Sequence, residues 1–448
     1  MRATFTEFTT GKPFLPMAGR KGPDLAAAGY VRSEWEMRGE AVSYEVGPAG
    51  VPEDGRVELA EADRAAFATR LLVRRPEPEA FSGVLLVEWL NVSGGQDAAP
   101  EYTYVADEIL RQGHAWVGIS AQYIGVEGGD AAVGLGGMTA GLRRHTPERY
   151  GDLHHPGDAY SYDIVTQLAA YARDPEPGGP LGDLRPATVI AVGESQSAFA
   201  LTSYVNGVDP LTRAFDGYFL HSRGAGYLPY DDRGRSSDIA ASLFNGPVRL
   251  REDVGVPVLL VQAEGDLTFP MGFAPARQPD SERIVTWEIA GSAHADVFQL
   301  GEFAPFVDCG GPINSGQQAF VLRGALRHLL AWVAGGTRPP SAPPVEMVDD
   351  EVIIDDWGHA RGGVRTPAVD APVERLVGAP LPDAQPICML LGRTIEVSPA
   401  ALEARWTSRQ EYLDAYREVT DRLIGEGFLL AEDREEILAD ARVERLSA

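Results

Sequence analysis

A serine, a histidine and an aspartate stand at positions in this chain from which they could carry out acyl transfer. Residues 193–197 read Gly-Glu-Ser-Gln-Ser, directly after an apolar run and directly before a run rich in Ala, Phe and Leu. A serine on a sharp turn between a strand and a helix has its hydroxyl exposed for attack on a carbonyl. Ser197 replaces the glycine that is usual at the second small position, but it is still small. The pattern predicts Ser195 as a nucleophile.

A serine hydroxyl needs a general base near neutral pH, normally a histidine that a carboxylate orients. Four histidines follow Ser195, at positions 221, 294, 328 and 359. His294 lies in the small-residue loop 290–296, just after the last predicted strand, and we predict that it is the base. His328 falls inside a predicted amphipathic helix, where a packing or surface role is expected.

Two carboxylates in the loop 262–270 could orient that histidine. The loop follows the penultimate predicted strand, and the order serine, acid, histidine is the one expected for a nucleophile on a strand-to-helix turn. We predict Asp266 as the acid, with Glu264 as the alternative.

The negative charge that develops on a substrate oxygen needs two N–H donors. The first predicted donor is the N–H of Gln196, directly after the nucleophile. The second is expected from the glycine-containing loop 90–95, where we predict Asn91; this loop could equally be a simple tight turn. Aromatic and histidine side chains that could line a substrate pocket, or could belong to the core, are Trp89, Tyr123, Phe199, His221 and Phe269.

Strands alternating with helices are predicted to position these residues. The predicted strands are 29–37, 66–75, 83–90, 114–120, 188–192, 217–221, 256–262 and 284–289, and the predicted helices include 100–112, 162–171 and 317–333. This alternation indicates an α/β fold with a mostly parallel central sheet covered by helices on both faces. Ligands bind such sheets at the carboxyl ends of the strands, where Ser195 is expected.

Three segments stand outside this alternation. Residues 123–157, rich in Gly, His and Arg, could form a lid insertion within a core domain of residues 1–335, or an ordinary surface loop. Residues 336–397 carry repeated Gly and Pro and are predicted to be an extended linker that wraps the core. Residues 398–448 are predicted to form a helical appendage, with Ser408 and Glu411 as a capping box at the start of one helix.

Composition excludes several classes of function. The chain has 448 residues and a formal net charge of -26, and we find no cluster of Lys and Arg, which argues against binding of nucleic acid or of an anionic membrane. Cys309 and Cys388 leave a disulfide open, but do not suggest a disulfide framework or a Cys-rich zinc site. His154 and His155, near Asp152 and Asp158, are adjacent loop residues that would seldom chelate one ion, so no metal is expected.

The N-terminal residues lack the apolar core of a signal peptide, and no apolar run approaches the ~20 residues that span a bilayer. We therefore expect a cytoplasmic protein.

The motifs around Ser195, Asp266 and His294 resemble those of the alpha/beta hydrolase superfamily. More narrowly, the chain resembles bacterial "alpha/beta hydrolase domain-containing" proteins of about this length. The segments that carry the likeness are 87–95, 114–118, 290–296, 362–367 and 427–430. The resemblance implies a serine-dependent hydrolase that needs no metal or other cofactor, and it names no substrate.

The leading interpretation is a carboxylic-ester hydrolase (a serine esterase) that acts on a small-molecule ester or lactone through an acyl-enzyme. A lactonase or an acyltransferase would use the same residues, and amide hydrolysis fits them less well. A binding protein without activity, on a hydrolase scaffold, is the alternative from a different class. The oligomeric state is left open.

Overall fold

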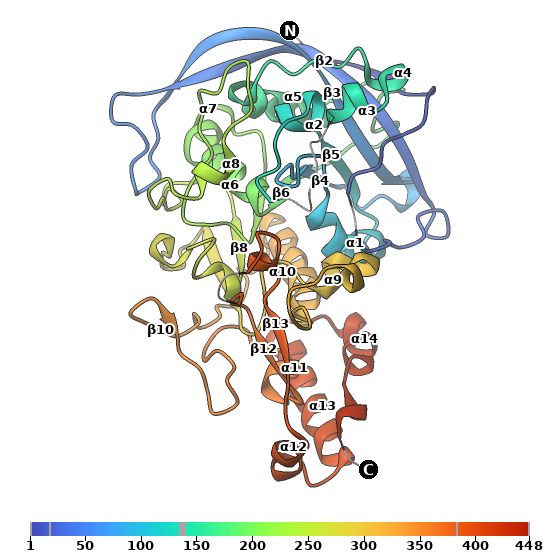
Figure 1. The fold of residues 1–448 in the computed structure, drawn as a ribbon. Coiled ribbons are helices and arrows are strands. Elements are labelled where there is room, and N and C mark those ends of the chain that lie inside the picture. Colours follow the sequence, from blue (N-terminus) through green and yellow to red (C-terminus); the bar gives the residue numbers. More distant parts are fainter. Residues whose placement is uncertain (1, 18, 134–139, 382–383, 447–448) are drawn as a thin grey trace. The chain divides into compact units, whose positions relative to one another are not determined.

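The computed structural model describes residues 2–17, 19–133, 140–381 and 384–446 (Figure 1). The chain divides into two compact units. The first unit comprises residues 1–258 and 275–284, and the second comprises residues 259–274 and 285–448. The domain boundaries predicted at 335 and 397 both fall inside the second unit, and the division into core, linker and appendage stays a prediction.

A nine-stranded sheet has the strand order β1-β2-β3-β5-β4-β6-β7-β8-β9. The pairs β1–β2, β2–β3 and β3–β5 are antiparallel, whereas β5–β4, β4–β6 and β6–β7 are parallel. The bounds are β1 (Thr4–Glu7), β2 (Tyr30–Val46), β3 (Leu59–Pro76), β4 (Val84–Trp89), β5 (Ala115–Ile119), β6 (Thr188–Glu194), β7 (Gly217–His221), β8 (Val258–Ala263) and β9 (Ile284–Ile289). The predicted α/β class with a mostly parallel sheet is confirmed. Strand β1 was not predicted, and β2 and β3 are longer than the predicted strands 29–37 and 66–75.

The central parallel strands are continuous apolar runs because both of their faces are covered. Leu85, Leu86 and Val87 of β4 are buried, as are Val189 and Ile190 of β6. The register pairs Glu88 with Val192, so β4 and β6 end at the same edge of the sheet.

Helices α1 (Pro100–Arg111) and α5 (Ser161–Arg173) connect these strands. The step from β4 to β5 and the step from β5 to β6 run in opposite directions across the sheet. Right-handed crossovers therefore put α1 and α5 on opposite faces. The strand order reverses at β4, so the crevice between the carboxyl ends of β4 and β6 is the topological switch point where ligands bind in open α/β sheets.

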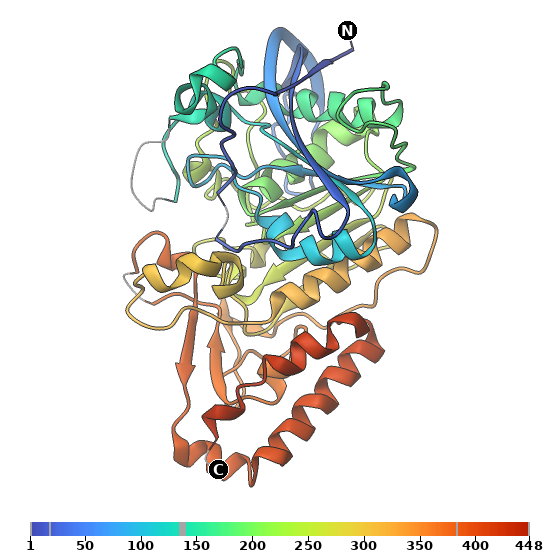
Figure 2. The ribbon, with the colours of Figure 1, turned by 90° about the vertical axis from the view of Figure 1, so that its right-hand side faces the viewer.

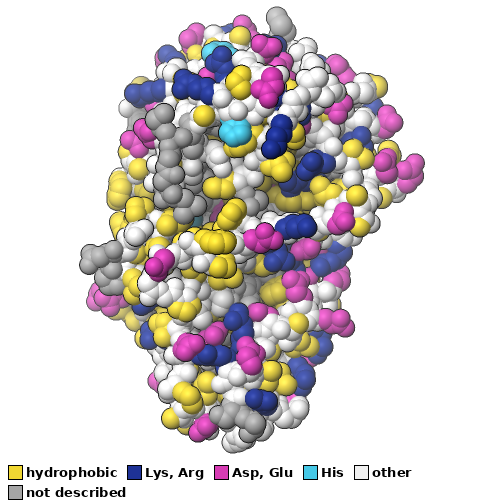
Figure 3. Space-filling model, turned by 45° about the vertical axis from the view of Figure 1, so that its right-hand side comes forward, with side chains coloured by type: hydrophobic (Ala, Val, Ile, Leu, Met, Phe, Trp, Pro, Cys, Tyr) yellow, Lys and Arg dark blue, Asp and Glu magenta, His cyan; other side chains and the backbone are white. Residues whose placement is uncertain are grey.

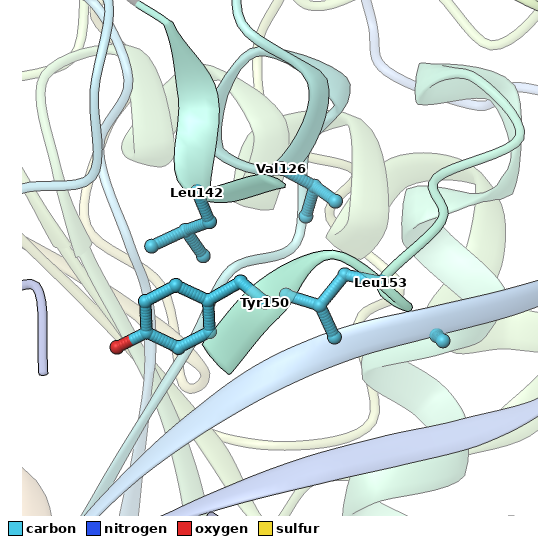
Figure 4. Close-up of a cluster of buried hydrophobic side chains, with 5 residues drawn as sticks. Val126, Leu142, Tyr150 and Leu153 are labelled. Atoms are coloured by element: carbon cyan, nitrogen blue, oxygen red, sulfur yellow. The ribbon is translucent and has the colours of Figure 1, made fainter. Parts of the chain in front are cut away.

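Residues 123–157 form short helices whose apolar side chains pack on β3. These helices are α2 (Tyr123–Glu127), α3 (Gly141–His145) and α4 (Pro147–Tyr150). Figure 4 shows Val126, Leu142, Tyr150 and Leu153 pointing toward one another, and together with Ala68 of β3 they form one buried cluster. Residues 134–139 lie outside the described part, and the predicted lid role of 123–157 stays a prediction.

The second unit continues from β9 into further helices and two small sheets (Figure 2). Their bounds are α9 (Val297–Leu300), α10 (Gln318–Val333), β10 (Met347–Val348), β11 (Glu351–Val352), α11 (Pro367–Asp370), β12 (Glu374–Val377), β13 (Arg393–Glu396), α12 (Pro399–Arg405), α13 (Arg409–Glu426) and α14 (Arg434–Ala439). The remaining helices, α6 (Gln196–Ser203), α7 (Asp209–Thr212) and α8 (Ile239–Ser242), belong to the first unit. The two-stranded sheets β10–β11 and β12–β13 lie within residues 336–397, the segment predicted to be an extended linker.

The predicted start of α13 is confirmed with one difference. The Ser408 hydroxyl accepts the Glu411 N–H at 3.1 Å, as expected of an N-cap. The Glu411 carboxylate, however, accepts from the N–H and hydroxyl of Thr407, at 2.6 Å each, rather than from the N–H of Ser408. The helix ends at Gly427, whose φ of 88° is the left-handed conformation that glycine adopts readily.

Cys309 and Cys388 form a disulfide within the second unit, with their Cα atoms 5.5 Å apart. The sequence left this pairing open. Disulfides are more typical of oxidising compartments than of the cytoplasm, and the predicted cytoplasmic location stays a prediction.

On the face in Figure 3, acidic and basic side chains are interspersed, and the basic side chains of the described residues do not gather into one patch on it. In the described part of the chain, none of the helices combines the length and the apolar character that a membrane span requires.

Candidate active site

Ser195 lies in a strained turn between β6 and α6. Its backbone has φ 59° and ψ -124°, a combination that costs a residue with a side chain about 1–3 kcal/mol. The Ser195 N–H donates to the carbonyl of His221, at the end of the neighbouring strand β7, at 2.9 Å. Such strain persists only where the surrounding structure holds it, and it is typical of functional positions.

Gly193 is required by the close approach of β6 and α6. A Cβ atom at this position would lie 2.9 Å from the Cβ of Ser197 and 3.1 Å from a methyl carbon of Leu201. Because Ser197 is small, the helix can start this close to the strand. The local sequence is therefore consistent with a nucleophile elbow.

Asp266 and His294 lie together in the second unit. His294 Nδ1 is 2.6 Å from Oδ1 of Asp266, and both side chains are buried. The other Asp266 oxygen, Oδ2, accepts the N–H of Ala263 at 2.7 Å, which fixes the carboxylate at the end of β8. A carboxylate on Nδ1 holds the imidazole in the tautomer whose Nε2 can accept a proton.

Glu264, the alternative acid, bonds to backbone instead. Its carboxylate accepts the N–H of Gly291 at 2.7 Å and the N–H of Gly378 at 3.0 Å. Burial raises the pKa of Glu264, and these two backbone bonds oppose that rise. The carboxylate thus ties together three segments of the second unit, which is a structural role.

The loop that carries His294 is held on both sides of the histidine. The side-chain amide of Gln318, in α10, donates to the carbonyl of Ala293 at 3.1 Å. The N–H of Ala295 donates to the carbonyl of Leu390 at 3.0 Å. These bonds restrict the position of the imidazole.

The predicted second donor, Asn91, lies in the loop after β4 and already has hydrogen-bond partners. The Asn91 N–H already donates to the carbonyl of Ala98 at 2.9 Å, and the Asn91 side chain donates to the carbonyl of Glu194 at 3.1 Å. The geometry does not favour Asn91 as a donor to substrate, because a backbone bond holds its N–H. The next N–H, of Val92, donates at 3.2 Å to the side-chain oxygen of Gln196, the residue after Ser195.

A family model described as an alpha/beta hydrolase domain matches residues 3–439. The chain belongs to this family. The resemblance to the alpha/beta hydrolase superfamily and the hydrolase fold predicted from the sequence are thus confirmed. No curated protein matches the chain.

Solved structures that match the chain include an alpha/beta serine hydrolase without a lid from Xanthomonas campestris, at 14% identity and a TM-score of 0.31, covering 58% of this chain and 87% of that chain. A dienelactone hydrolase, described as putative, from Klebsiella pneumoniae matches at 12% identity and a TM-score of 0.31, covering 67% of this chain and 98% of that chain. A glucuronoyl esterase from Solibacter usitatus matches at 12% identity and a TM-score of 0.29, covering 63% of this chain and 70% of that chain.

A buried polar network supports the turn of this alpha/beta hydrolase beside Ser195. The Gln196 amide donates to Gln122 Oε1 at 2.5 Å, and the same oxygen accepts the indole N–H of Trp89 at 3.0 Å. The Gln122 amide donates in turn to Asp158 at 3.2 Å, and Asp158 also accepts the N–H of Tyr123 at 2.7 Å. Burial raises the pKa of Asp158 to about 6.

A second buried cluster lies behind the turn. His221 Nδ1 is 3.0 Å from Glu101 Oε2 and 4.0 Å from a carboxylate oxygen of Glu194, and the ring packs edge-on against Tyr104. Donor atoms of Glu101, Glu194 and His221 lie within 4.8 Å of one another, so this is a group in the described part that could hold a metal ion. Two of these atoms, Nδ1 of His221 and Oε2 of Glu101, are already in direct contact with each other.

Glu88, at the end of β4, lies next to this cluster. Burial, together with the nearby Glu101 carboxylate, raises the pKa of Glu88 to about 8. The Glu88 carboxyl accepts the indole N–H of Trp116 at 2.8 Å and the N–H of Tyr102 at 2.9 Å, which opposes the rise. Burial thus favours the neutral form of the Glu88 carboxyl.

The side chains predicted for a substrate pocket have different environments. Trp89, Phe199 and His221 are buried, which favours the alternative interpretation that they belong to the core. Phe269 is 61% exposed. Tyr123 lines a cavity of about 430 Å³ in the first unit.

Several polar residues near the turn were missed by the sequence analysis, notably Gln122, Glu88 and Glu101. Gln122 follows a predicted strand by two positions, and Glu88 is a charged residue inside an apolar strand, which is an unusual placement. Those two signals were available in the sequence. Nothing in the sequence pairs Glu101 with a histidine 120 positions away.

Proposed function

We propose that this alpha/beta hydrolase cleaves carboxylic esters, with Ser195 as nucleophile, His294 as general base and Asp266 as the carboxylate that orients it. The observation that carries the proposal is the 2.6 Å contact between His294 Nδ1 and Asp266 Oδ1. A buried carboxylate on Nδ1 stabilises the imidazolium that forms when Nε2 takes a proton.

In the first half-reaction, the Ser195 oxygen attacks the ester carbonyl carbon while His294 Nε2 accepts the hydroxyl proton. The carbonyl oxygen becomes an oxyanion, and the N–H of Gln196, at the start of α6, is the proposed first donor to it. The first N–H groups of a helix have no partner within the helix and suit a developing negative charge. We propose Val92 as the second donor, in place of Asn91, with the Gln196 side chain giving up its bond to the Val92 N–H.

Collapse of the tetrahedral intermediate breaks the bond to the alcohol, which leaves with the proton from His294. Water then attacks the acyl-enzyme, His294 takes a proton from that water, and the carboxylic acid leaves as Ser195 regains its proton. A lactone would follow the same steps with the alcohol still attached to the acyl group. An acyltransferase would replace the water with an acceptor alcohol.

The strained backbone of Ser195 supports this assignment from the first unit. A positive φ at a residue with a side chain is uncommon, and here it occurs at the one position in residues 193–197 that the chemistry requires. Gly193, which has no Cβ, lets α6 start close to β6 directly after this turn.

A fluorophosphonate probe tests the proposal. We expect covalent labelling of the wild type and none of Ser195→Ala, with Ser203→Ala, in the same helix, labelled as the wild type. Labelling that persists in Ser195→Ala would place the reactive nucleophile at another residue, and labelling that never appears in the wild type would favour the binding-protein alternative. A panel of p-nitrophenyl esters and lactones, with and without an acceptor alcohol, then separates esterase, lactonase and acyltransferase activity.

A further inference from the structure

A cavity of about 430 Å³ lies in the first unit, between α2, α3 and the segment after α4. The residues that line it are Tyr123, Glu127, Arg143, His154, His155, Pro156 and Gly234. None of these residues is needed for the acyl chemistry described above, and a cavity of this size can hold a group such as a monosaccharide.

Hydrogen bonds connect this cavity to the turn that carries Ser195. Tyr123 follows Gln122 directly, and Gln122 is bonded at 2.5 Å to the side chain of Gln196, the residue after the nucleophile. The N–H of Tyr123 is fixed by Asp158 at 2.7 Å. Tyr123, in the wall of the cavity, is therefore adjacent in sequence to Gln122, which bonds directly to the residue after Ser195. This position suits a subsite for one part of a substrate attached to Ser195.

The charges in the cavity balance. The Glu127 carboxylate is 2.6 Å from the Arg143 guanidinium, accepts the N–H of His155 at 2.9 Å, and lies 3.4 Å from Nδ1 of His154. The Arg143 side chain is 38% exposed and that of His154 is 58% exposed, so both remain within reach of a ligand.

His155 contributes a neutral ring. Its Nε2 donates to the carbonyl of Ala121 at 2.8 Å, its Nδ1 accepts the N–H of Gly157 at 3.3 Å, and burial lowers its pKa to about 4. The ring packs edge-on against Tyr123, with the centroids 6.3 Å apart. The cavity thus combines aromatic surface with donors and acceptors fixed by the fold.

We propose that this cavity binds the hydroxyl-rich alcohol part of the ester substrate, a sugar or another polyol. The inference rests on the proposed function, since it assigns a subsite of that same reaction. Vicinal hydroxyls both donate and accept, so they can bond to a guanidinium and a carboxylate at once. An alkyl chain would displace water from the partly exposed Arg143 and His154 side chains without offering them a hydrogen bond, which is costly. A carboxylate ligand would have to compete with Glu127 for the Arg143 guanidinium.

Two acetate esters that share the acyl group and differ in the alcohol test this inference, namely an acetylated xylose and ethyl acetate. We expect Arg143→Met to lower kcat/KM for the acetylated xylose about tenfold, which corresponds to about 1.4 kcal/mol, and to leave ethyl acetate unchanged. Arg144→Met, on the exposed neighbouring position of α3, is the matched control and should change neither. If Arg143→Met does not fold, Tyr123→Leu replaces it, because that change keeps the backbone bond to Asp158.

Three outcomes would overturn the inference while the proposed function stands: equal loss for both esters, no preference of the wild type for the acetylated xylose, or a preference for O-acetylglycolate, an acetate ester whose alcohol part carries a carboxylate. Free xylose should also inhibit the wild type competitively, and inhibit Arg143→Met less. Fluorophosphonate labelling of the same preparations keeps the two questions separate, since failure of the proposed function abolishes Ser195 labelling.

Discussion

His294 Nδ1 lies 2.6 Å from Asp266 Oδ1, whereas Glu264, two residues before Asp266, bonds to the backbone N–H groups of Gly291 and Gly378. The two carboxylates share one turn after β8 and have different tasks. One is placed to orient an imidazole, and the other joins three segments of the second unit. This division leads to the first prediction.

Asp266→Asn should lower kcat by about a thousandfold or more, because an amide at this position no longer stabilises the imidazolium or selects its tautomer. Glu264→Gln should leave kcat of the folded enzyme close to that of the wild type. It should instead lower the free energy of unfolding by about 1–3 kcal/mol, since one of two buried N–H donors would face an amide NH2. Steady-state kinetics and urea unfolding of both variants measure this, and a reversed pattern would assign Glu264 as the acid.

Ser195→Gly should be more stable than Ser195→Ala. Glycine adopts φ 59° without steric cost, while alanine keeps the strain of about 1–3 kcal/mol. The greater chain entropy of glycine in the unfolded state offsets about 0.5–1 kcal/mol of this gain. Both variants lack the Ser195 hydroxyl, so the comparison isolates the effect of the backbone conformation. Equal thermal and urea stability of the two would show that the turn is unstrained.

Glu88→Gln should weaken the pH dependence of stability. The pKa of Glu88 is raised from 4.5 to about 8, so between these values the native state holds a proton that the unfolded state releases. The wild type should therefore lose stability as the pH rises from about 4.5 toward 8, by up to about 1.4 kcal/mol per pH unit from this group. Glutamine resembles the protonated form and removes the contribution.

Urea unfolding at pH 5, 6.5 and 8 measures this change, with the exposed Glu79→Gln as control. A Glu88→Gln variant whose stability falls with pH as steeply as that of the wild type would mean that Glu88 is ionised in the native state.

Replacing Cys309 and Cys388 by serine should lower the free energy of unfolding by about 2–4 kcal/mol, because the disulfide closes a loop with a sequence separation of 79. A reductant should destabilise the wild type to a similar degree and leave the double variant unchanged. Two reactive thiols in the native protein without reductant would contradict the disulfide.

The strands and the turn at Ser195 could be predicted because their signals are local. The apolar run before Ser195 indicates a strand buried on both faces, and the small residues at 193 and 197 indicate a tight strand-to-helix turn. The positions of Asp266 and His294 after successive strands follow from chain order on a parallel sheet. The length of β2 and β3 was missed, because their outer parts are polar and carry little hydrophobic signal.

The residues themselves thus determined the fold class, the turn and a short set of candidate chemical groups. Tertiary structure alone decided which of two neighbouring carboxylates contacts His294. It also decided that the Asn91 N–H donates to the carbonyl of Ala98, and that Gln196 bonds to Gln122, 74 residues away in the sequence. Periodicity and turn chemistry depend on near neighbours in the chain. The direction of a side chain, and the donor or acceptor it meets, depend on segments that come together only when the chain folds.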